Sequence, residues 1–443
     1  MKKVFAICLL AMTGMQAFAQ NGINSPYSRY GFGMMADRSM GFNKAMGGVA
    51  QGFRDGQEIN PANPASYAAV DSMSALFDLG LSAYNGNYKM GNLQQNARNT
   101  SFDYFAFQFR ARKGIGMAVG ILPFTNTSYS FSSNSEQLQG NGTITSSYTF
   151  SGSGGIHKFF FGTGFQIIEP LSVGFNIAYL TGDYSHTSTM SFSQSSAYSM
   201  VRGYSADIST YTAEVGAQYT FKLNKKDKLT VGATYGLGHD IKNRAYRNTQ
   251  TINSSAATVG QSGDTLKNAF QLPHTLSVGF AYAHANKWKA GADFTFEKWS
   301  DARFPADDAN GAYVSTKGHL NDHLRLSAGG EYTPNHFGTK LHQRITYKFG
   351  GYYSQSYANA DLTGTITKKP TEFGLSAGLS IPITNRNIWY NSPHINIGVH
   401  WVHSNIPYLN TQTLKQQTLT ENYLKVSLGL TFNERWFYKY KVK

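Results

Sequence analysis

One stretch near the carboxyl end of the chain groups the residue types of a serine hydrolase. His403, Ser404 and Asn405 follow one another in the sequence WVHSNIPY. A serine nucleophile needs a histidine base beside it, within hydrogen-bonding reach. Because neighbouring residues of a strand point to opposite faces, this spacing does not bring the two side chains together. We therefore predict that the chain is not an enzyme, and a lipid hydrolase is the less favoured alternative.

A second stretch repeats itself without a gap. Asn60-Pro61-Ala62 is followed at once by Asn63-Pro64-Ala65. Two prolines this close exclude a regular helix or a central strand. The neighbours Ile59, Tyr67 and Val70 are apolar, so the segment does not have the composition of a linker. We expect a rigid and compact structure here, ahead of the first strand.

The amino terminus has the pattern of a secretory signal peptide. Lys2 and Lys3 precede an apolar run, residues 4–15, and Ala17-Phe18-Ala19 forms a small-x-small cleavage site. We assign residues 1–19 to the signal. The one cysteine of the chain, Cys8, lies inside it, so the mature protein has neither disulfides nor thiolate metal sites. We predict no metal and no cofactor.

Strict alternation of apolar and polar residues dominates the chain after residue 73. In LSVGFNIAYLT, Leu171, Val173, Phe175 and later odd-numbered residues share one face, and Ser172 and its neighbours share the other. About fourteen such strands follow, each long enough for a tilted membrane strand of about 9–11 residues. Their centres are Leu79, Phe107, Val119, Phe160, Phe175, Val215, Ala233, Val278, Ala292, Ala328, Tyr347, Ala377, Ile397 and Leu428.

The connections between these strands alternate in length. Short turns are expected at residues 111–114, 169–170, 224–227 and 284–286, and long polar loops near residues 185–203, 245–268, 301–321, 355–369 and 404–420. This alternation is typical of an outer-membrane barrel, and a sheet in a bilayer must close on itself. We predict an all-β, antiparallel transmembrane barrel over residues 74–443. A soluble sandwich or propeller is less favoured because its strands are shorter.

The overall composition agrees with a barrel and argues against nucleic acid. The 443 residues include 28 Tyr, 30 Phe and 45 Gly, and only 14% are charged. The net charge is +14, but the basic residues are scattered and form no motif that reads a nucleic-acid groove. We predict export to the outer membrane of a Gram-negative bacterium, contact with its lipid and lipopolysaccharide, and a monomer.

Residues 20–73 are predicted to plug the barrel. A barrel of this size encloses more space than its own side chains fill. The polar faces of the strands are rich in glycine, which weakens a strand unless something must come close to its backbone. A disordered tail is less favoured because the segment is too apolar. The apolar residues expected to contact the lumen are Phe32, Met34, Met35, Phe53 and Tyr67.

The sequence resembles the long-chain fatty acid transporter (FadL-like) family of outer-membrane channels. The resemblance rests on KAMGGVAQGFRDG (residues 44–56), NPASY (residues 63–67), the hairpin from Leu272 to Ser300 that opens on Leu-Pro and closes on Trp-Ser, and SPYSRYGFG (residues 25–33). The last stretch resembles the branch of Bacteroidetes-type bacteria. The resemblance extends over essentially the whole mature chain.

The resemblance implies a fourteen-stranded barrel with an amino-terminal hatch and passive uptake of hydrophobic molecules such as long-chain fatty acids. It gives the gate role to Asn63, Pro64 and Ala65, with Asn60, Pro61 and Ala62 extending the turn. The ligand would bind an apolar lumen pocket and leave sideways near this hatch, through an opening at a kinked early strand. Our candidates for the kink are Gly152, Gly154 and Gly155 in the fourth strand.

The charged lumen residues have two interpretations. Glu214, Asp293, Arg325 and Glu331 lie on polar strand faces. They could bind the headgroup of a ligand, or pair with the plug, and the pairing is favoured because ionisable groups in membrane proteins usually find protein partners. A general diffusion porin and a surface-binding or adhesin barrel remain the alternative functions.

Overall fold

The computed structural model describes residues 24–91, 93–139, 142–194, 196–285, 287–308, 310–359, 369–383, 393–410 and 415–435. The predicted signal peptide lies outside the described residues. No helix in the described ranges is long and apolar enough to cross a membrane.

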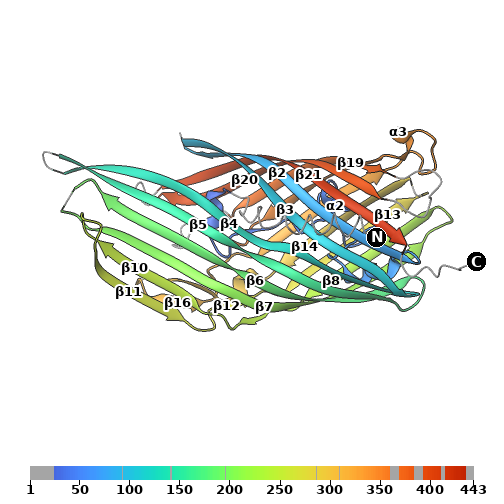
Figure 1. The fold of residues 1–443 in the computed structure, drawn as a ribbon, viewed down its shortest axis with the longest axis horizontal. Coiled ribbons are helices and arrows are strands. Elements are labelled where there is room, and N and C mark those ends of the chain that lie inside the picture. Colours follow the sequence, from blue (N-terminus) through green and yellow to red (C-terminus); the bar gives the residue numbers. More distant parts are fainter. Residues whose placement is uncertain are drawn as a thin grey trace, which may run out of the picture.

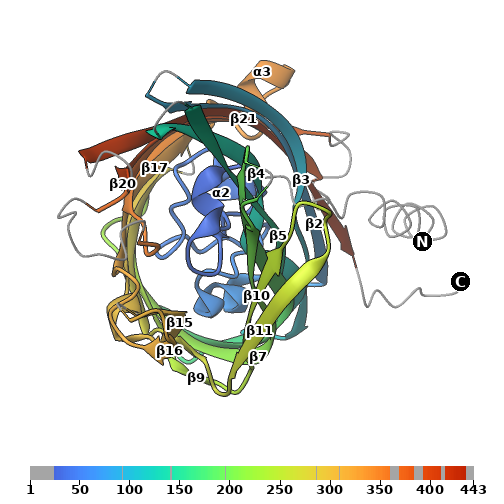
Figure 2. The same ribbon diagram turned by 90° about the vertical axis from the view of Figure 1, so that its left-hand side faces the viewer.

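Fourteen antiparallel strands of the described residues close into a tilted barrel (Figures 1 and 2). Each pairs with the next, and β2 pairs with β21 to complete the ring, as in the register pair Leu79 and Leu430. All fourteen predicted strand centres fall inside these strands, so the predicted fold class and strand number are confirmed. The strands are β2 (Ser74–Met90), β3 (Leu93–Arg112), β4 (Ile115–Gln139), β5 (Gly142–Gln166), β6 (Leu171–Phe192), β7 (Ser199–Lys222), β8 (Asp227–Gly236), β13 (Thr275–His284), β14 (Trp288–Glu297), β17 (His323–Tyr332), β18 (Thr346–Gln355), β19 (Thr371–Pro382), β20 (His394–Asn410) and β21 (Lys415–Arg435).

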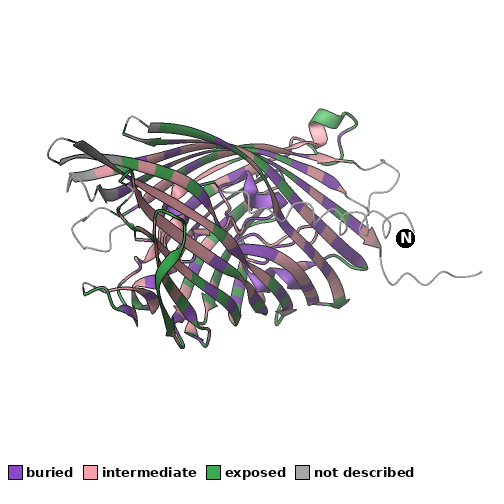
Figure 3. Cartoon of the chain, turned by 60° about the vertical axis from the view of Figure 1, so that its left-hand side comes forward, coloured by how far each residue is buried: buried purple, intermediate pink, exposed green. Residues whose placement is uncertain are grey.

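The wall turns apolar side chains outward and small or polar ones inward. On β6, Phe175 and Ile177 are exposed on the outer face, whereas Asn176 and Ala178 are buried on the inner face. The bands of alternating burial along the strands are visible in Figure 3. The alternation that predicted the strands therefore also sets their orientation.

The two ends of the barrel differ. Tight turns join β3 to β4, β5 to β6, β7 to β8 and β13 to β14 at one end, which we call the short-turn end. The longest connection that the structure describes in full at this end is residues 333–345, which contain α3 (Leu341–Arg344). At the opposite, long end lie β9 (His239–Ile241), β10 (Ala245–Ile252), β11 (Thr258–Leu266), β12 (Phe270–Leu272), η4 (Trp299–Asp301), β15 (Phe304–Asp307) and β16 (Tyr313–Thr316).

Three of the segments predicted as long loops are largely strand. In the segment near residues 404–420, β20 runs on to Asn410 and β21 begins at Lys415. β6 runs on to Phe192, β7 begins at Ser199, and residues 245–268 form the β10–β11 hairpin, whose first strand also pairs with β7. The prediction took polar composition as a sign of loops. Thr and Tyr favour strands even when both faces meet water, so the ladder continues beyond the apolar part of the wall.

Residues 24–73 lie inside the barrel, where α2 (Gly41–Lys44) occupies the centre of the view along the axis (Figure 2). We call residues 24–73 the luminal segment. Its other elements are η2 (Pro26–Arg29), β1 (Met34–Met35) and η3 (Pro64–Ala69).

Candidate functional site

The luminal segment from residue 40 to 73, which we call the docked part, lies directly on wall glycines. A Cβ on Gly232 of β8 would come within 1.9 Å of the Gln51 carbonyl oxygen. A Cβ on Gly116 of β4 would come equally close to the Tyr67 oxygen. No side chain fits at these positions, because the two backbones are already in contact. Similar contacts with the luminal backbone occur at Gly164, Gly174, Gly329 and Gly350.

The two Asn-Pro-Ala triplets belong to this docked part. The Asn63 side chain donates to the carbonyl oxygens of Gln51 (3.1 Å) and Ala217 (3.3 Å), and its own oxygen accepts from the Ala65 amide at the start of η3. The Asn60 amide donates to Ala50 and Phe53. Asn63 and Ala65 are fully buried. This geometry is that of an anchor for the turn, held by hydrogen bonds on both sides.

Two apolar clusters contain buried residues of the luminal segment. The first contains Phe53 and Tyr67 of the docked part. The second surrounds Phe32, whose ring centroid lies 5.1 Å from that of Phe304 and 5.3 Å from that of Phe270. Phe32 is only 1% exposed. Phe32, Phe53 and Tyr67 therefore all pack against other apolar side chains.

The bridging stretch, residues 34–39, connects these clusters and is held differently. Met34 and Met35 form β1, which pairs with Asn126 and Thr125 of β4. The Ala36 amide donates to the Phe124 carbonyl oxygen at 3.0 Å. Residues 34–38 are half-buried, whereas Gly33 before them and Ser39 after them are buried.

Charged side chains tie the bridging stretch to opposite walls. A guanidinium nitrogen of Arg38 lies 2.9 Å from a carboxylate oxygen of Glu297 on β14. On the other side, Lys425 Nζ of β21 lies 3.7 Å from Asp37. Lys44 of the docked part forms a buried ion pair with Asp103 of β3.

The barrel wall is split where β1 meets it. β3 and β4 pair only from Phe105–Ile121 down to Arg112–Ile115, although both strands run much further toward the long end. From Leu122 onward, β4 keeps its ladder with β5 but no longer pairs with β3. Part of the edge that β3 leaves is instead paired with β1. We call this separation of β3 and β4 the wall split.

Pro123 explains why the split begins there. Proline has no amide hydrogen and is confined to strand edges and bulges. The ladder between β4 and β5 shifts register between Pro123 and Thr125, which marks a bulge. The sequence ILPFTNT contains this signal inside an otherwise regular strand, and the prediction overlooked it.

The predicted kink at Gly152, Gly154 and Gly155 is not an opening. Each of these residues has a register partner on β4 and on β6, so the ladder of β5 is continuous on both sides. Gly154 has a φ of +129°, a conformation that glycine tolerates without a gap in the wall. The interruption lies one strand earlier than predicted.

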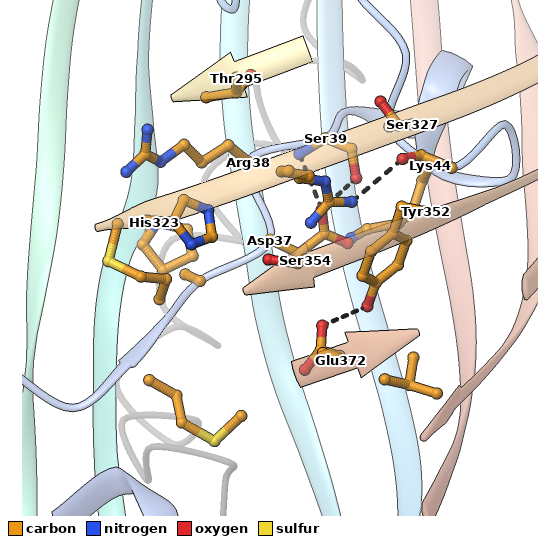
Figure 4. A pocket seen from close by; sticks show the side chains of 18 of the residues that line it. Asp37, Arg38, Ser39, Lys44, Thr295, His323, Ser327, Tyr352, Ser354 and Glu372 are labelled. Carbon is orange, nitrogen blue, oxygen red and sulfur yellow. Dashed lines mark hydrogen bonds between the residues drawn. The ribbon is translucent and has the colours of Figure 1, made fainter. Parts of the chain in front are cut away.

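A cavity of about 330 Å³ lies between the two apolar clusters, within the lower part of the usual range for small-molecule sites, about 300–1,000 Å³. Figure 4 shows Arg38, His323 and Tyr352 around it. The lining includes Ser101 and Asp103 of β3 and residues 122–124 of β4, so the cavity reaches both edges of the wall split.

The sequence predicted an apolar pocket in the lumen, and the cavity has both apolar and charged side chains in its lining. The charged members are Asp37, Arg38, Lys44, Asp103, Lys158, Glu214, Asp293, Glu297, Arg325, Glu372, Glu421 and Lys425. The apolar and aromatic members include Met34, Met35, Leu122, Phe124, Tyr84 and Tyr88.

The four predicted lumen charges all have protein partners. Glu214 pairs with Lys158 at 2.5 Å, and Glu331 pairs with Lys289 at 3.0 Å. The other two bind the docked part.

One oxygen of Asp293 accepts from the backbone amides of Ala50 and Gln51. Arg325 donates to the Gly47 oxygen, and its guanidinium lies 3.8 Å from the centre of the Tyr352 ring. The residues that sequence reasoning missed are those of the bridging stretch, Asp37 and Arg38, and their wall partners.

The hydrolase triplet is divided between the two faces of β20. Ser404 is buried and donates to Glu372. His403 instead contacts Asn422 (2.7 Å) and Asn405 (3.0 Å). Within the described residues, no group of three or more His, Cys, Asp or Glu is arranged to hold a metal ion.

Comparison with known proteins gives one family and a set of similar folds. The model of the BamG family matches residues 1–443. None of the curated proteins matches the chain. A Pseudomonas aeruginosa FadL homologue superposes with a TM-score of 0.60 at 13% identity, covering 90% of this chain and 99% of that one.

Two hydrocarbon channels are similarly close in fold. The CymD monoaromatic hydrocarbon channel has a TM-score of 0.57 at 15% identity, and the P. putida toluene transporter TodX has 0.57 at 14%. In both cases the match covers 90% of this chain and 98% of the other. At these identities the comparison establishes that the chain has the FadL-type fold.

Proposed function

The chain belongs to the BamG family, and we propose that it acts as an outer-membrane channel for the passive passage of small hydrophobic or amphipathic molecules. The observation that carries the proposal is the wall split beside a cavity. The cavity lining contains residues from both strand edges at the split, Asp103 on β3 and Phe124 on β4, and the Phe124 carbonyl oxygen accepts from the Ala36 amide of the bridging stretch. A molecule in this cavity would leave sideways into lipid once the bridging stretch moved away from β4.

Physical chemistry favours this route over an open pore. An alkyl chain gains roughly 0.8 kcal/mol for each methylene that leaves water, so a water-filled channel offers it nothing. The cavity would hold the polar head of the molecule, and the wall split would pass the tail to lipid without rehydration. Conduction requires that binding be moderate and that the barrier be movable.

The placement in the membrane follows from the wall. Its outer face is apolar, and we place it in the outer membrane of a Gram-negative bacterium, in contact with lipid and lipopolysaccharide. The short-turn end would face the periplasm and the long end the exterior, as is usual for such barrels. We propose a monomer.

We assign the moving gate to residues 34–39 rather than to the Asn-Pro-Ala triplets. Moving Asn63 would break its hydrogen bonds with Gln51 and Ala217 and separate η3 from the wall glycines. Moving residues 34–36 would break the short β1–β4 pairing and expose half-buried side chains. The predicted hatch at Asn60–Ala65 would then be a fixed support for the gate.

Reversible cross-linking of β1 to β4 tests the proposal. Met35 and Thr125 are register partners, and such pairs have Cα separations near 4.5–5.5 Å, which a disulfide can bridge. The mature chain has no other cysteine, so a Met35→Cys/Thr125→Cys variant would form one defined bond. We expect uptake of a fluorescent fatty acid into proteoliposomes to fall severalfold on oxidation and to recover with reductant.

The matched control is Thr220→Cys/Thr230→Cys, a register pair between β7 and β8 in the unbroken wall. Its oxidation should leave uptake unchanged. Equal uptake by the oxidised and reduced Met35→Cys/Thr125→Cys protein would contradict both the proposed gate and the proposed side exit.

A surface-binding role is the second candidate function. The supporting observation is the β10–β11 hairpin at the long end, where eight of the nine residues of β11 are exposed. Within the described residues the lumen is filled by two apolar clusters, which argues against a general diffusion porin.

A further inference from the structure

The segment between β17 and β18, residues 333–345, differs from the tight turns of the short-turn end. It projects sideways, outside the barrel wall, as α3 shows in both Figure 1 and Figure 2. Phe337 within it is 90% exposed, and Leu341 is 49% exposed. We call residues 333–345 the outer loop.

The outer loop is internally ordered. The Asn335 amide donates to the Gln343 carbonyl oxygen at 2.8 Å, which closes the base of the loop. The Asn335 side chain accepts from the Phe337 amide at 3.1 Å. These bonds hold Phe337 at the tip of a fixed turn. A large apolar side chain held in water by a defined structure indicates an interaction surface.

The charge of the outer loop is entirely basic. It contains Lys340, Arg344 and two histidines, and no acidic residue. Other turns of the short-turn end also carry basic residues, such as Arg112 at the end of β3 and Lys113 after it. Their acidic residues are in contact with partners, Glu169 with Lys222 and Asp227 with His284.

The base of the outer loop continues an aromatic row on the outside of the wall. Trp288 and Tyr332 are register partners with ring centroids 4.2 Å apart, and Tyr347 is the register partner of Tyr332 on the next strand. In membrane barrels such aromatic girdles mark the boundary between acyl chains and headgroups. The outer loop therefore leaves the wall at this boundary and extends along the membrane plane.

We propose that the outer loop docks on the anionic phospholipid leaflet that surrounds the short-turn end. Phe337 and Leu341 would enter the acyl boundary, and Lys340 would lie among the lipid phosphates. Interfacial segments combine apolar insertion and basic residues in this way. The sideways projection favours lipid over a protein partner. The inference rests on the membrane placement proposed above.

Spin labels on single cysteines test the inference in the full chain, reconstituted into vesicles of phosphatidylethanolamine and phosphatidylglycerol. A label at Phe337→Cys should show the oxygen accessibility of the acyl boundary. A label at Lys225→Cys, on the exposed β7–β8 turn without an aromatic tip, should remain accessible to a water-soluble relaxant. A label at Val278→Cys, on the outer face of the wall, should report the acyl interior.

The three labels separate the two hypotheses. If position 278 is water-accessible, the membrane placement itself fails. If position 278 is in lipid and position 337 is as accessible to the water-soluble relaxant as position 225, the outer-loop inference alone is overturned.

A separate comparison tests whether docking requires anionic lipid and Lys340. We expect the label at position 337 to move toward water in vesicles of phosphatidylcholine alone, and also when Lys340→Gln is added. An insertion depth that is independent of both lipid charge and Lys340 would overturn the anionic part of the inference.

Discussion

The docked part (residues 40–73) and the bridging stretch (residues 34–39) belong to one luminal segment but are fixed in opposite ways. The docked part lies backbone to backbone on wall glycines such as Gly232, with the Asn63 side chain bonded on two sides. The bridging stretch is half-buried and held by two register pairs and by long ionic side chains. The difference separates a part that must stay from a part that can move.

The same contrast appears in the wall that each part contacts. The docked η3 packs on β4, β5, β6 and β7 where their ladders are continuous; Gly116 of β4, for example, still pairs with Arg110 of β3. The bridging stretch lies on β4 at the wall split, where the ladder to β3 has ended at Ile121. Because hydrogen-bonded strands in a bilayer separate only at a cost, a side exit is expected where the separation already exists.

The largest expected effect comes from filling a glycine contact under the docked part. In Gly232→Ala the new methyl group would meet the Gln51 oxygen at 1.9 Å, and backbone must shift to make room. We expect a loss of about 1–3 kcal/mol in the free energy of unfolding, as for other overpacked sites. The measurement is the thermal midpoint of the heat-modifiable barrel.

Gly236→Ala on the same strand is the control for this variant. The nearest atom to its added methyl group is the Thr275 Cβ at 3.3 Å, so the side chain can adjust. The two variants should differ clearly in midpoint. If they are equally stable, the close docking of residues 40–73 is not the feature that fixes them.

Arg38→Gln in the bridging stretch should have a smaller effect on stability than Gly232→Ala, and it should also change uptake. The change leaves Glu297 with the Trp299 indole as a hydrogen-bond donor but without its cation. The Arg38 side chain is 39% exposed, but Glu297 is only 2% exposed and keeps just the Trp299 hydrogen bond, so the cost to stability should be about 1 kcal/mol. Because the stretch would be less firmly held, uptake of a fluorescent fatty acid should rise.

Arg54→Gln provides the matched change in the docked part. Arg54 donates only a long bond to the Pro170 oxygen, at 3.5 Å. We expect its uptake rate to equal that of the unmodified protein. If uptake becomes faster in Arg54→Gln, or does not become faster in Arg38→Gln, the moving element lies elsewhere.

The sequence was informative wherever one short-range rule dominates. Period-two alternation identified all fourteen strands, and inward glycines such as Gly116 and Gly232 indicated that a backbone lies against the wall. The pairing of Asp293 and Arg325 with the luminal segment followed from the cost of an isolated charge in a membrane protein.

The site itself depended on contacts that no local pattern contains. The pairing of Met35 with Thr125 spans ninety residues of chain, and the ionic partners of Asp37 and Arg38 lie on β21 and β14. The wall split did have a local signal in Pro123, but glycine flexibility at Gly152–Gly155 was given more weight. A missing donor interrupts a ladder, whereas a flexible residue only bends it.

Hydrogen exchange of the full chain in lipid nanodiscs tests most directly whether the bridging stretch moves while the docked part stays. The Ala36 amide donates to Phe124 of β4, and the Ala50 and Gln51 amides donate to Asp293. We expect Ala36 to exchange at least roughly tenfold faster than the other two, because local opening needs less free energy there. Equal protection at the three amides, or earlier exchange at Ala50 and Gln51, would contradict the account.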